Sequence, residues 1–570
     1  MRSWSNLVPA IGQARRYRPE WLAKDVAAGL VITGLLAPAG MAYAAAAGLP
    51  PVTGLYATIM PLLVYALFGP SRIMILGPDS SLTPLLIAAI LPLAAVGSDD
   101  AVAIAGALGV LAGLICVAAG LARFGFLAEL LSAPVRYGYL HGIAITIIVA
   151  QTATLCGFSV KGETILRQLQ HLADGFGDGL FNGWAFGVGL ASVAAIVLLR
   201  WLWPAAPATL MVVIGGIVAG VVLDLGSRAV PLVGDLPHGL PSPALPDVDW
   251  QTLRSLLGAS LGIAFVSFAD TSVLSRSMAL RRHESVDSNH ELVALGLANV
   301  ASGFFHGFPV SGSSSRTPVA EAAGSRTQLT GVVAGLALLV ITVAAPMTFR
   351  NLPSATLAAI VIAAAISLIN IPEMARLYRV RRSEFALAIV ALLAVAVLGP
   401  ITGVVVAVSL SVLNFLRLAW KPHTAELVRV DGLKGYHDRA RHPDGQVVPG
   451  LLLYRFDAPL FFANASFFAQ DVQQRIAVQD SPVRCLVITA EPITDIDTTA
   501  AAALRALVDD LSRGGIEVRF AELKGTVRDR LNHYEVFDEQ HPVRSSRTIG
   551  EAVKQYLHDY QQPWVDWEDR

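Results

Sequence analysis

The chain has 570 residues, of which 54% are hydrophobic and only 15% are charged, and its formal net charge is −1. Soluble domains contain about a quarter charged residues, so this composition indicates a protein of the lipid bilayer. The near-zero net charge argues against a nucleic-acid partner. The cysteines, Cys116, Cys156 and Cys485, are too far apart in the sequence to indicate a metal site or a disulfide framework.

The charged residues are distributed unevenly along the chain. Residues 421–570 hold 41 of the 85 Asp, Glu, Lys and Arg residues, and the first 420 residues hold the other 44. This contrast predicts a membrane domain followed by a soluble one. The expected divisions are a cytoplasmic N-terminal segment over 1–24, a transmembrane domain over 25–420, a linker over 421–447, a soluble domain over 448–560 and a tail over 561–570.

Fourteen apolar stretches could cross a bilayer, which takes about 20 residues per helix, or fewer where a helix is broken. The third and the tenth are short, and each follows helix-breaking residues, Gly77-Pro78 and Gly307-Phe308-Pro309. Fourteen spans divide into two halves of seven. Because seven is odd, the second half enters the membrane upside down relative to the first, which predicts an inverted repeat with paired broken helices. The predicted spans are 25–45, 52–68, 80–95, 101–121, 126–151, 183–201, 207–224, 254–278, 288–305, 313–324, 329–346, 354–370, 384–399 and 401–419.

Loop charges predict the orientation of these spans. If the N-terminus is cytoplasmic, most loop arginines lie on the inside, whereas the outside loops hold Asp99-Asp100 and the acidic stretch 235–249. Positive charge favours the cytoplasmic side, so both termini are expected in the cytoplasm and the protein in the inner (plasma) membrane. The arginines assigned to the inside are Arg72, Arg123, Arg200, Arg281, Arg282, Arg326, Arg376, Arg379, Arg381 and Arg382.

The two broken helices are expected to begin near the bilayer midplane with their N-termini facing each other. A helix N-terminus carries about half a positive charge and several free N–H donors, which favours an anion. Hydroxyl groups also cap helices and connect membrane helices, and the arginine could instead pair with Glu321 or Asp270. The residues of this candidate anion site are Asp79, Ser80, Ser81, Ser313, Ser314, Ser315 and Arg316.

Two carboxylates are candidates for coupling transport to an ion. Asp270 lies inside the eighth apolar span, where a charge is costly unless it is paired, protonated or bound to a cation. Asp79 could simply cap the third span, but an ionised Asp79 would cancel much of the field that attracts an anion. We therefore expect Asp79 or Asp270 to be protonated when the anion is bound.

Several motifs in the membrane region resemble the SulP family of sulfate permeases and related anion exchangers. They are the run from Pro309 to Thr317, Pro38 to Ala44, Gly48 to Tyr56, and Gly77-Pro78-Asp79. The resemblance implies core and gate subdomains that move like an elevator, a homodimer, and a substrate pocket that Tyr43 also lines. It also implies coupling to H⁺ or Na⁺; no cofactor beyond that ion is expected.

The C-terminal region alternates strands with helices, which predicts a small α/β sheet. Residues from Asp457 to Asn464 and from Asp495 to Ala500 resemble a STAS domain. In related STAS proteins the position of Thr499 is phosphorylated, so Asp497, Thr498 and Thr499 are regulatory candidates, with Asp497-Thr498 as a plain helix cap the alternative. The domain is also where a cytoplasmic protein partner would bind.

The residues leave three functions open. The first is secondary active transport of a small anion, with sulfate ahead of bicarbonate and C4-dicarboxylates. The second is a nucleobase permease, which shares the architecture but normally lacks the soluble tail. The third is an anion channel or a membrane-anchored signalling module. An enzyme is not expected, because no nucleophile–base pair, phosphate-binding loop or metal spacing stands out.

Overall fold

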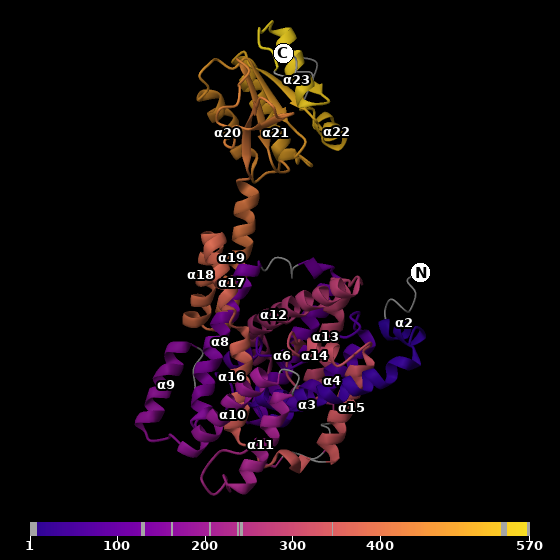
Figure 1. Cartoon of the computed structure of the whole chain (residues 1–570), viewed down its shortest axis with the longest axis vertical. Helices are drawn as coiled ribbons and strands as arrows, with labels where there is room; N and C mark the ends of the chain where they lie inside the picture. Colours follow the sequence, from indigo (N-terminus) through magenta and orange to yellow (C-terminus); the bar gives the residue numbers. More distant parts are fainter. Residues whose placement is uncertain are drawn as a thin grey trace. The chain divides into compact units, whose positions relative to one another are not determined.

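The computed structural model describes residues 8–126, 132–160, 164–203, 207–235, 239, 243–344, 346–536 and 544–566. The chain divides into two compact units, Met1–Val412 and Leu413–Arg570 (Figure 1). The first unit is helical and apolar, and the second contains a six-stranded sheet. The two units are described separately below.

Each of the fourteen expected spans corresponds to a helix in the described chain. Eight helices there are long and apolar enough to cross a membrane, judged by length and composition. The third and tenth spans are short, and the helix of the fifth begins at Ala133, later than expected. The helices are α3 (Leu22–Ala46), α4 (Pro51–Phe68), α5 (Thr83–Ile90), α6 (Asp99–Leu121), α8 (Ala133–Leu155), α10 (Gly183–Leu202), α11 (Ala208–Val222), α12 (Trp250–Arg282), α13 (Ser288–Phe304), α14 (Arg316–Ala322), α15 (Leu329–Ala344), α16 (Ser354–Leu368), α18 (Arg382–Leu398) and α19 (Pro400–Trp420).

In the described residues, three further α-helices connect or precede the spans: α2 (Pro9–Arg15), α9 (Ile165–Gly177) and α17 (Ile371–Val380). The arginine cluster expected in an inside loop therefore lies on and just after a helix. Asn370 caps α17 by accepting a hydrogen bond from the Glu373 N–H at 3.1 Å. A ten-residue helix is too short to cross a bilayer, which is why an apolar-span search does not find it.

The spans pack as two groups, which lie on different sides of Figure 1. The first group contains α3, α4, α6, α12, α13 and α15, and the second contains α8, α10, α16 and α18. Small residues bring α6 and α13 close together, because a Cβ added at Gly303 would lie only 2.3 Å from the carbonyl oxygen of Gly106. The two groups meet where α16 packs against α3.

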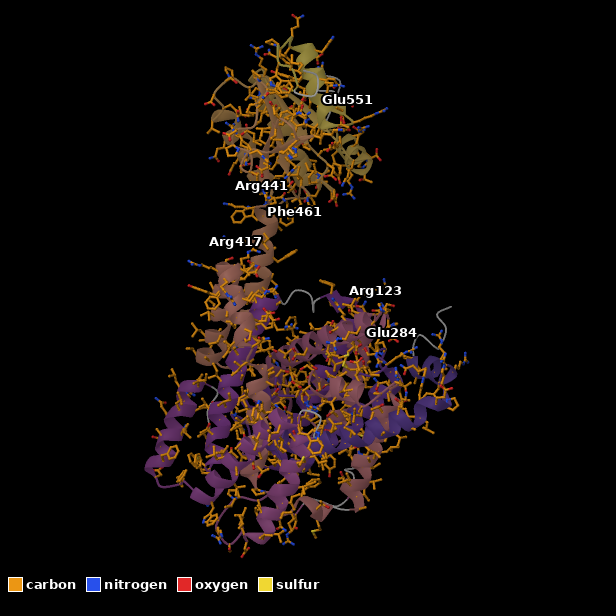
Figure 2. All side chains as sticks on the ribbon, in the orientation of Figure 1. Arg123, Glu284, Arg417, Arg441, Phe461 and Glu551 are labelled. Carbon is orange, nitrogen blue, oxygen red and sulfur yellow. The ribbon has the colours of Figure 1, made fainter. Side chains whose placement is uncertain are left out.

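Charges assigned to the inside loops gather at one end of the membrane unit. Figure 2 shows Arg123 and Glu284 at this end. Nε of Arg72 lies 3.4 Å from Oε1 of Glu284, and Arg281 and Arg282 both form ion pairs with Glu321. These ion pairs bring together charged residues that are distant in the sequence.

The soluble unit is a single mixed sheet with strand order β4-β3-β5-β6-β7-β8. Strands β5 to β8 are parallel, and β3 pairs antiparallel with both β4 and β5. The alternation of strands and helices that we expect in this region is present. They are β5 (Leu451–Phe456), β6 (Cys485–Thr489), β7 (Glu517–Ala521), α20 (Ala465–Ala477), α21 (Thr498–Arg513), α22 (Gly525–His533) and α23 (Ile549–Asp559).

The expected linker over 421–447 was wrong in part, because it contains β3 (Thr424–Arg429) and β4 (Tyr436–Asp438). Charged residues in and beside these strands form ion pairs within the soluble unit. Nη1 of Arg439 lies 2.8 Å from Glu426, and Nε of the buried Arg429 lies 2.8 Å from Asp566. A strand that contains polar residues resembles a linker in the sequence, because the partners that these residues find in the fold cannot be seen there. The last strand, β8 (Ser545–Ser546), was also not predicted.

Candidate functional site

The two helix breaks are joined by a short antiparallel strand pair. Strand β1 (Leu76–Gly77) pairs with β2 (Ser311–Gly312), with Leu76 opposite Gly312 and Gly77 opposite Ser311. The Ser313 N–H extends the pairing by donating to the carbonyl of Ile75 at 3.0 Å. Helices α5 and α14 begin a few residues after these strands, so their starts lie side by side within the helical unit.

Helix α12 fixes the second break from behind. The hydroxyl of Ser267 donates to the carbonyl of Val310 at 2.6 Å, and the N–H of Gly312 donates to the hydroxyl of Thr271 at 2.8 Å. Asn299 of α13 holds Val310 through both its backbone groups. These bonds satisfy backbone groups that have no helical partner inside the membrane.

A cavity of about 570 Å³ opens beside the start of α14. Its lining comes from α3, α10, the start of α11, α14 and α16, so it lies between the two helix groups. Among the described residues, the charged members of this lining are Arg200 and Arg316, and no Asp or Glu belongs to it. The lining residues are Leu30, Val31, Leu35, Ala39, Tyr43, Ile196, Arg200, Pro207, Ala208, Thr209, Leu210, Ser315, Arg316, Val319, Ile360, Ala363 and Ala364.

Arg316, the first residue of α14, is 5% exposed. Its Nη2 donates a hydrogen bond to the carbonyl of Pro78 and lies 3.9 Å from Oδ2 of Asp79. Its Nη1 is buried and has no hydrogen-bond partner among the described residues. Cζ lies 5.9 Å from the ring centre of Tyr43. A buried guanidinium with a spare donor beside a cavity can bind an anion.

The alternative partners expected for Arg316 are not its partners. Glu321 pairs with Arg281 and Arg282, and the carboxylate within ion-pair distance of Arg316 is that of Asp79. Gly77 makes this arrangement possible, since a Cβ at that position would lie 2.9 Å from Nη1 of Arg316.

Asp79 orders the start of α5 as well as facing Arg316. Its Oδ1 accepts hydrogen bonds from the Ser81 N–H at 3.1 Å and the Ser81 hydroxyl at 3.0 Å. The Thr83 hydroxyl donates to the Asp79 carbonyl at 3.0 Å. Asp79 is therefore not the N-cap of α5, because the cap position is Leu82 and no side chain caps it. Its carboxylate instead holds Ser81, ahead of the helix, and faces Arg316.

The remaining predicted site residues divide into those that reach the cavity and those that support it. Tyr43 and Ser315 line the cavity together with Arg316. Ser313 is buried, and its hydroxyl accepts a hydrogen bond from the Arg316 N–H at 3.3 Å. The lining does not include Asp79, Ser80, Ser81, Ser313 or Ser314.

Asp270 lies on α12 and is partly buried. It interacts with the hydroxyl of Ser81 and lies within electrostatic range of Asp79 and Arg136. Within the part of the chain that the structure describes, no cation lies within ion-pair distance of it. The structure thus brings both candidate coupling carboxylates to the start of α5, on either side of Ser81.

Two residues of the membrane unit were not singled out by sequence reasoning. Arg200 was assigned to an inside loop, but it lines the cavity near the end of α10. Glu291 of α13 is fully buried and accepts hydrogen bonds from Tyr65, Ser71 and Ser275. A charge at the edge of an apolar span gives no sequence signal that distinguishes a cavity residue from a loop residue.

The regulatory candidates lie at the start of α21 in the soluble unit. Oδ1 of Asp497 accepts from the Ala500 N–H at 2.8 Å, and Oδ2 accepts from the Phe462 N–H at 2.8 Å. Asp497 is therefore a helix cap that also holds the preceding loop. Thr498 and Thr499 are exposed.

Two family descriptions match this chain. Residues 22–391 match the sulfate permease family, and residues 442–552 match the STAS domain. The first match covers more than half of the chain and contains the strand pair, Arg316 and the residues that line the cavity.

The chain is also similar to named proteins. A probable sulfate transporter of Mycobacterium tuberculosis is 40% identical over 550 residues, which are 96% of this chain and 98% of the relative. The structure of murine Slc26a9, an anion transporter in the inward-facing state, has a TM-score of 0.87 at 22% identity, covering 97% of this chain and 94% of the other. The transmembrane domain of a cyanobacterial bicarbonate transporter has a TM-score of 0.61 at 24% identity, covering 70% of this chain and 98% of that domain.

Proposed function

The chain belongs to the sulfate permease family, and on that premise we propose that it is a secondary active transporter of a small anion, with sulfate as its first substrate. The observation that carries this proposal is the buried Arg316, which lines a cavity and has one guanidinium nitrogen without a hydrogen-bond partner among the described residues. An oxyanion in the cavity would supply that partner, and the relative that is 40% identical bears the name of a probable sulfate transporter.

The anion would bind where the two broken helices begin. Arg316 supplies charge and a donor, Ser315 a hydroxyl, and Tyr43 a wall of the site. Charge-assisted hydrogen bonds to an oxyanion are about twice as strong as neutral ones. The strand pair fixes both helix starts, so the backbone that carries Ser315 and Arg316 is already in place when the anion arrives.

A proton (or, as the alternative, Na⁺) would accompany the anion. Asp79 lies 3.9 Å from Nη2 of Arg316, whereas Asp270 has no such ion-pair partner in the described chain. Asp270 is therefore the group that we expect to take the coupling proton. Neutral Asp270 leaves a more positive field for the anion on the far side of Ser81.

Release of the anion on the other side requires the cavity to open there. The cavity has walls from both helix groups, so a sliding of the group that contains α3 and α12 against the group that contains α8 and α16 would carry the site across the membrane. This is an elevator movement. We further propose a homodimer in the plasma membrane, with cytoplasmic termini and a soluble domain that acts on transport.

Uptake into proteoliposomes tests the proposal. Purified full-length protein should accumulate labelled sulfate above equilibrium when a proton gradient is imposed, and unlabelled sulfate inside should accelerate labelled uptake by counterflow. A competition panel of bicarbonate and C4-dicarboxylates, at two pH values with and without Na⁺, separates the related substrates and ions. Absence of counterflow for every anion in the panel would contradict a carrier.

A further inference from the structure

Two arginines reach the cavity, one from α14, which packs against α3 of the first helix group, and one from α10 of the second group. Arg316 comes from α14 and is buried, whereas Arg200 lies two residues before the end of α10 and is exposed. Tyr43 lines the same cavity, and its ring centre lies 5.9 Å from Cζ of Arg316. A mobile anion in this cavity therefore feels two positive charges, one fixed at the helix breaks and one at the wall of the other group.

The alternative role for Arg200 is that of a membrane anchor. Positive residues at the inside ends of spans commonly lie in the headgroup region, and Trp201 and Trp203 beside it are 77% and 61% exposed, as expected of residues that face lipid. Arg200, however, belongs to the cavity lining and its tryptophan neighbours do not. The helix turns about 100° per residue, so Arg200 and Trp201 face different directions.

The charge on Arg200 is not offset by an ion pair within the described chain. In the described part of the chain no carboxylate lies within ion-pair distance of it, and the cavity lining contains no Asp or Glu. Arg316, in contrast, lies 3.9 Å from Asp79, which offsets part of its field. The arginine that contributes an unopposed charge to the cavity is thus Arg200.

We infer that Arg200 is a specificity-determining residue, which makes the cavity favour divalent over monovalent anions. This inference rests on the proposed function and adds the charge class of the substrate to it. A Coulomb energy is proportional to the product of the charges, so one added positive charge stabilises a dianion twice as much as a monoanion at the same place. The ratio of affinities for the two classes then depends on the charge at position 200.

The test compares Arg200→Gln and Arg200→Lys with Arg376→Gln. Arg376 is an arginine of α17 whose side chain is 72% exposed, and it does not line the cavity. For each full-length variant in proteoliposomes we would measure the KM for labelled sulfate and the inhibition constant of nitrate against it. Equilibrium binding of labelled sulfate to solubilised protein gives the same two constants if a variant does not support uptake.

We expect Arg200→Gln to raise the KM for sulfate by about tenfold and the inhibition constant of nitrate by about threefold. The logarithm of the fold-change should be twice as large for the dianion as for the monoanion, because the lost Coulomb energy is twice as large. Arg200→Lys should stay close to the wild type, and Arg376→Gln should change neither constant. Added impermeant salt should weaken sulfate binding in the wild type more than in Arg200→Gln, because ions screen the unopposed charge.

Equal changes in both constants, or the same change in Arg376→Gln, would overturn the inference. A wild-type protein that neither binds nor carries sulfate would instead contradict the proposed function. The two failures are therefore distinguishable in one set of measurements.

Discussion

The two broken helices begin shortly after the same strand pair, but a carboxylate precedes one helix and an arginine begins the other. Helix α5 begins behind Asp79, whose carboxylate accepts two hydrogen bonds from Ser81, and α14 begins with Arg316, which keeps a nitrogen without a partner in the described chain. The carboxylate at the first start thus has internal partners, and the second start retains a buried, unpartnered donor in the described chain on a side chain that lines the cavity. The comparison teaches that similar backbone frames can present different groups, one a carboxylate with internal partners and the other a guanidinium with an unpartnered nitrogen in the described chain.

The largest expected effect is that of removing the cation. Arg316→Ala should lower sulfate uptake by about thirtyfold or more, since truncating one partner of a buried charge interaction costs about 2–5 kcal/mol. Arg316→Lys keeps the charge without the planar fork and should retain intermediate activity. Initial rates in proteoliposomes, at matched protein incorporation, measure both variants. Near-normal uptake by Arg316→Ala would show that the difference between the two helix starts has no functional meaning.

The second prediction tests whether the position of the guanidinium matters. Gly77→Ala adds a methyl group 2.9 Å from Nη1 of Arg316 and so displaces the side chain without changing any charge. We expect uptake to fall by about tenfold, because overpacking of about 1–3 kcal/mol must be relieved near the site. Gly12→Ala is the matched control, since a Cβ there has nothing within 4 Å. Equal rates for the two variants would contradict the close approach.

The third prediction concerns Asp270, which faces the start of α5 from α12. Asp270→Asn imitates the protonated form permanently, so uptake driven by internal sulfate should continue while its dependence on external pH is lost. Uptake measured over a pH series in the wild type and the variant decides this. A variant with unchanged pH dependence excludes Asp270 as the site of the coupling proton.

The smallest effect is expected at Asp79. Asp79→Asn keeps an oxygen that can accept the hydrogen bonds from Ser81 but removes the charge that lies 3.9 Å from Arg316. Sulfate should then bind about threefold more tightly, because Arg316 loses a competing anion. The pH dependence should persist if Asp270 carries the proton. Weaker binding in the variant would mean that Asp79 positions Arg316 more than it offsets its charge.

Much of the membrane fold could be predicted from the sequence, because spans of about 20 apolar residues have few alternatives in a bilayer. Gly77-Pro78 and Pro309 marked the breaks, and the helices follow them. The pairing of Gly77 with Ser311 could not be predicted, since two-residue strands have no sequence period. Arg200 was missed because its cavity is formed by residues from distant spans, and the β3–β4 strands were missed because ion pairs satisfy their charges.

The central claim is that the anion occupies the cavity beside Arg316. Ser315→Cys places an accessible thiol in the cavity lining, while the native Cys116, Cys156 and Cys485 are buried. A membrane-impermeant thiol reagent should label this variant, and saturating sulfate should slow labelling several-fold, whereas the exposed Thr498→Cys should be labelled at the same rate with or without sulfate. Equal labelling of Ser315→Cys with and without sulfate, in protein shown to bind sulfate, would contradict a binding site in this cavity.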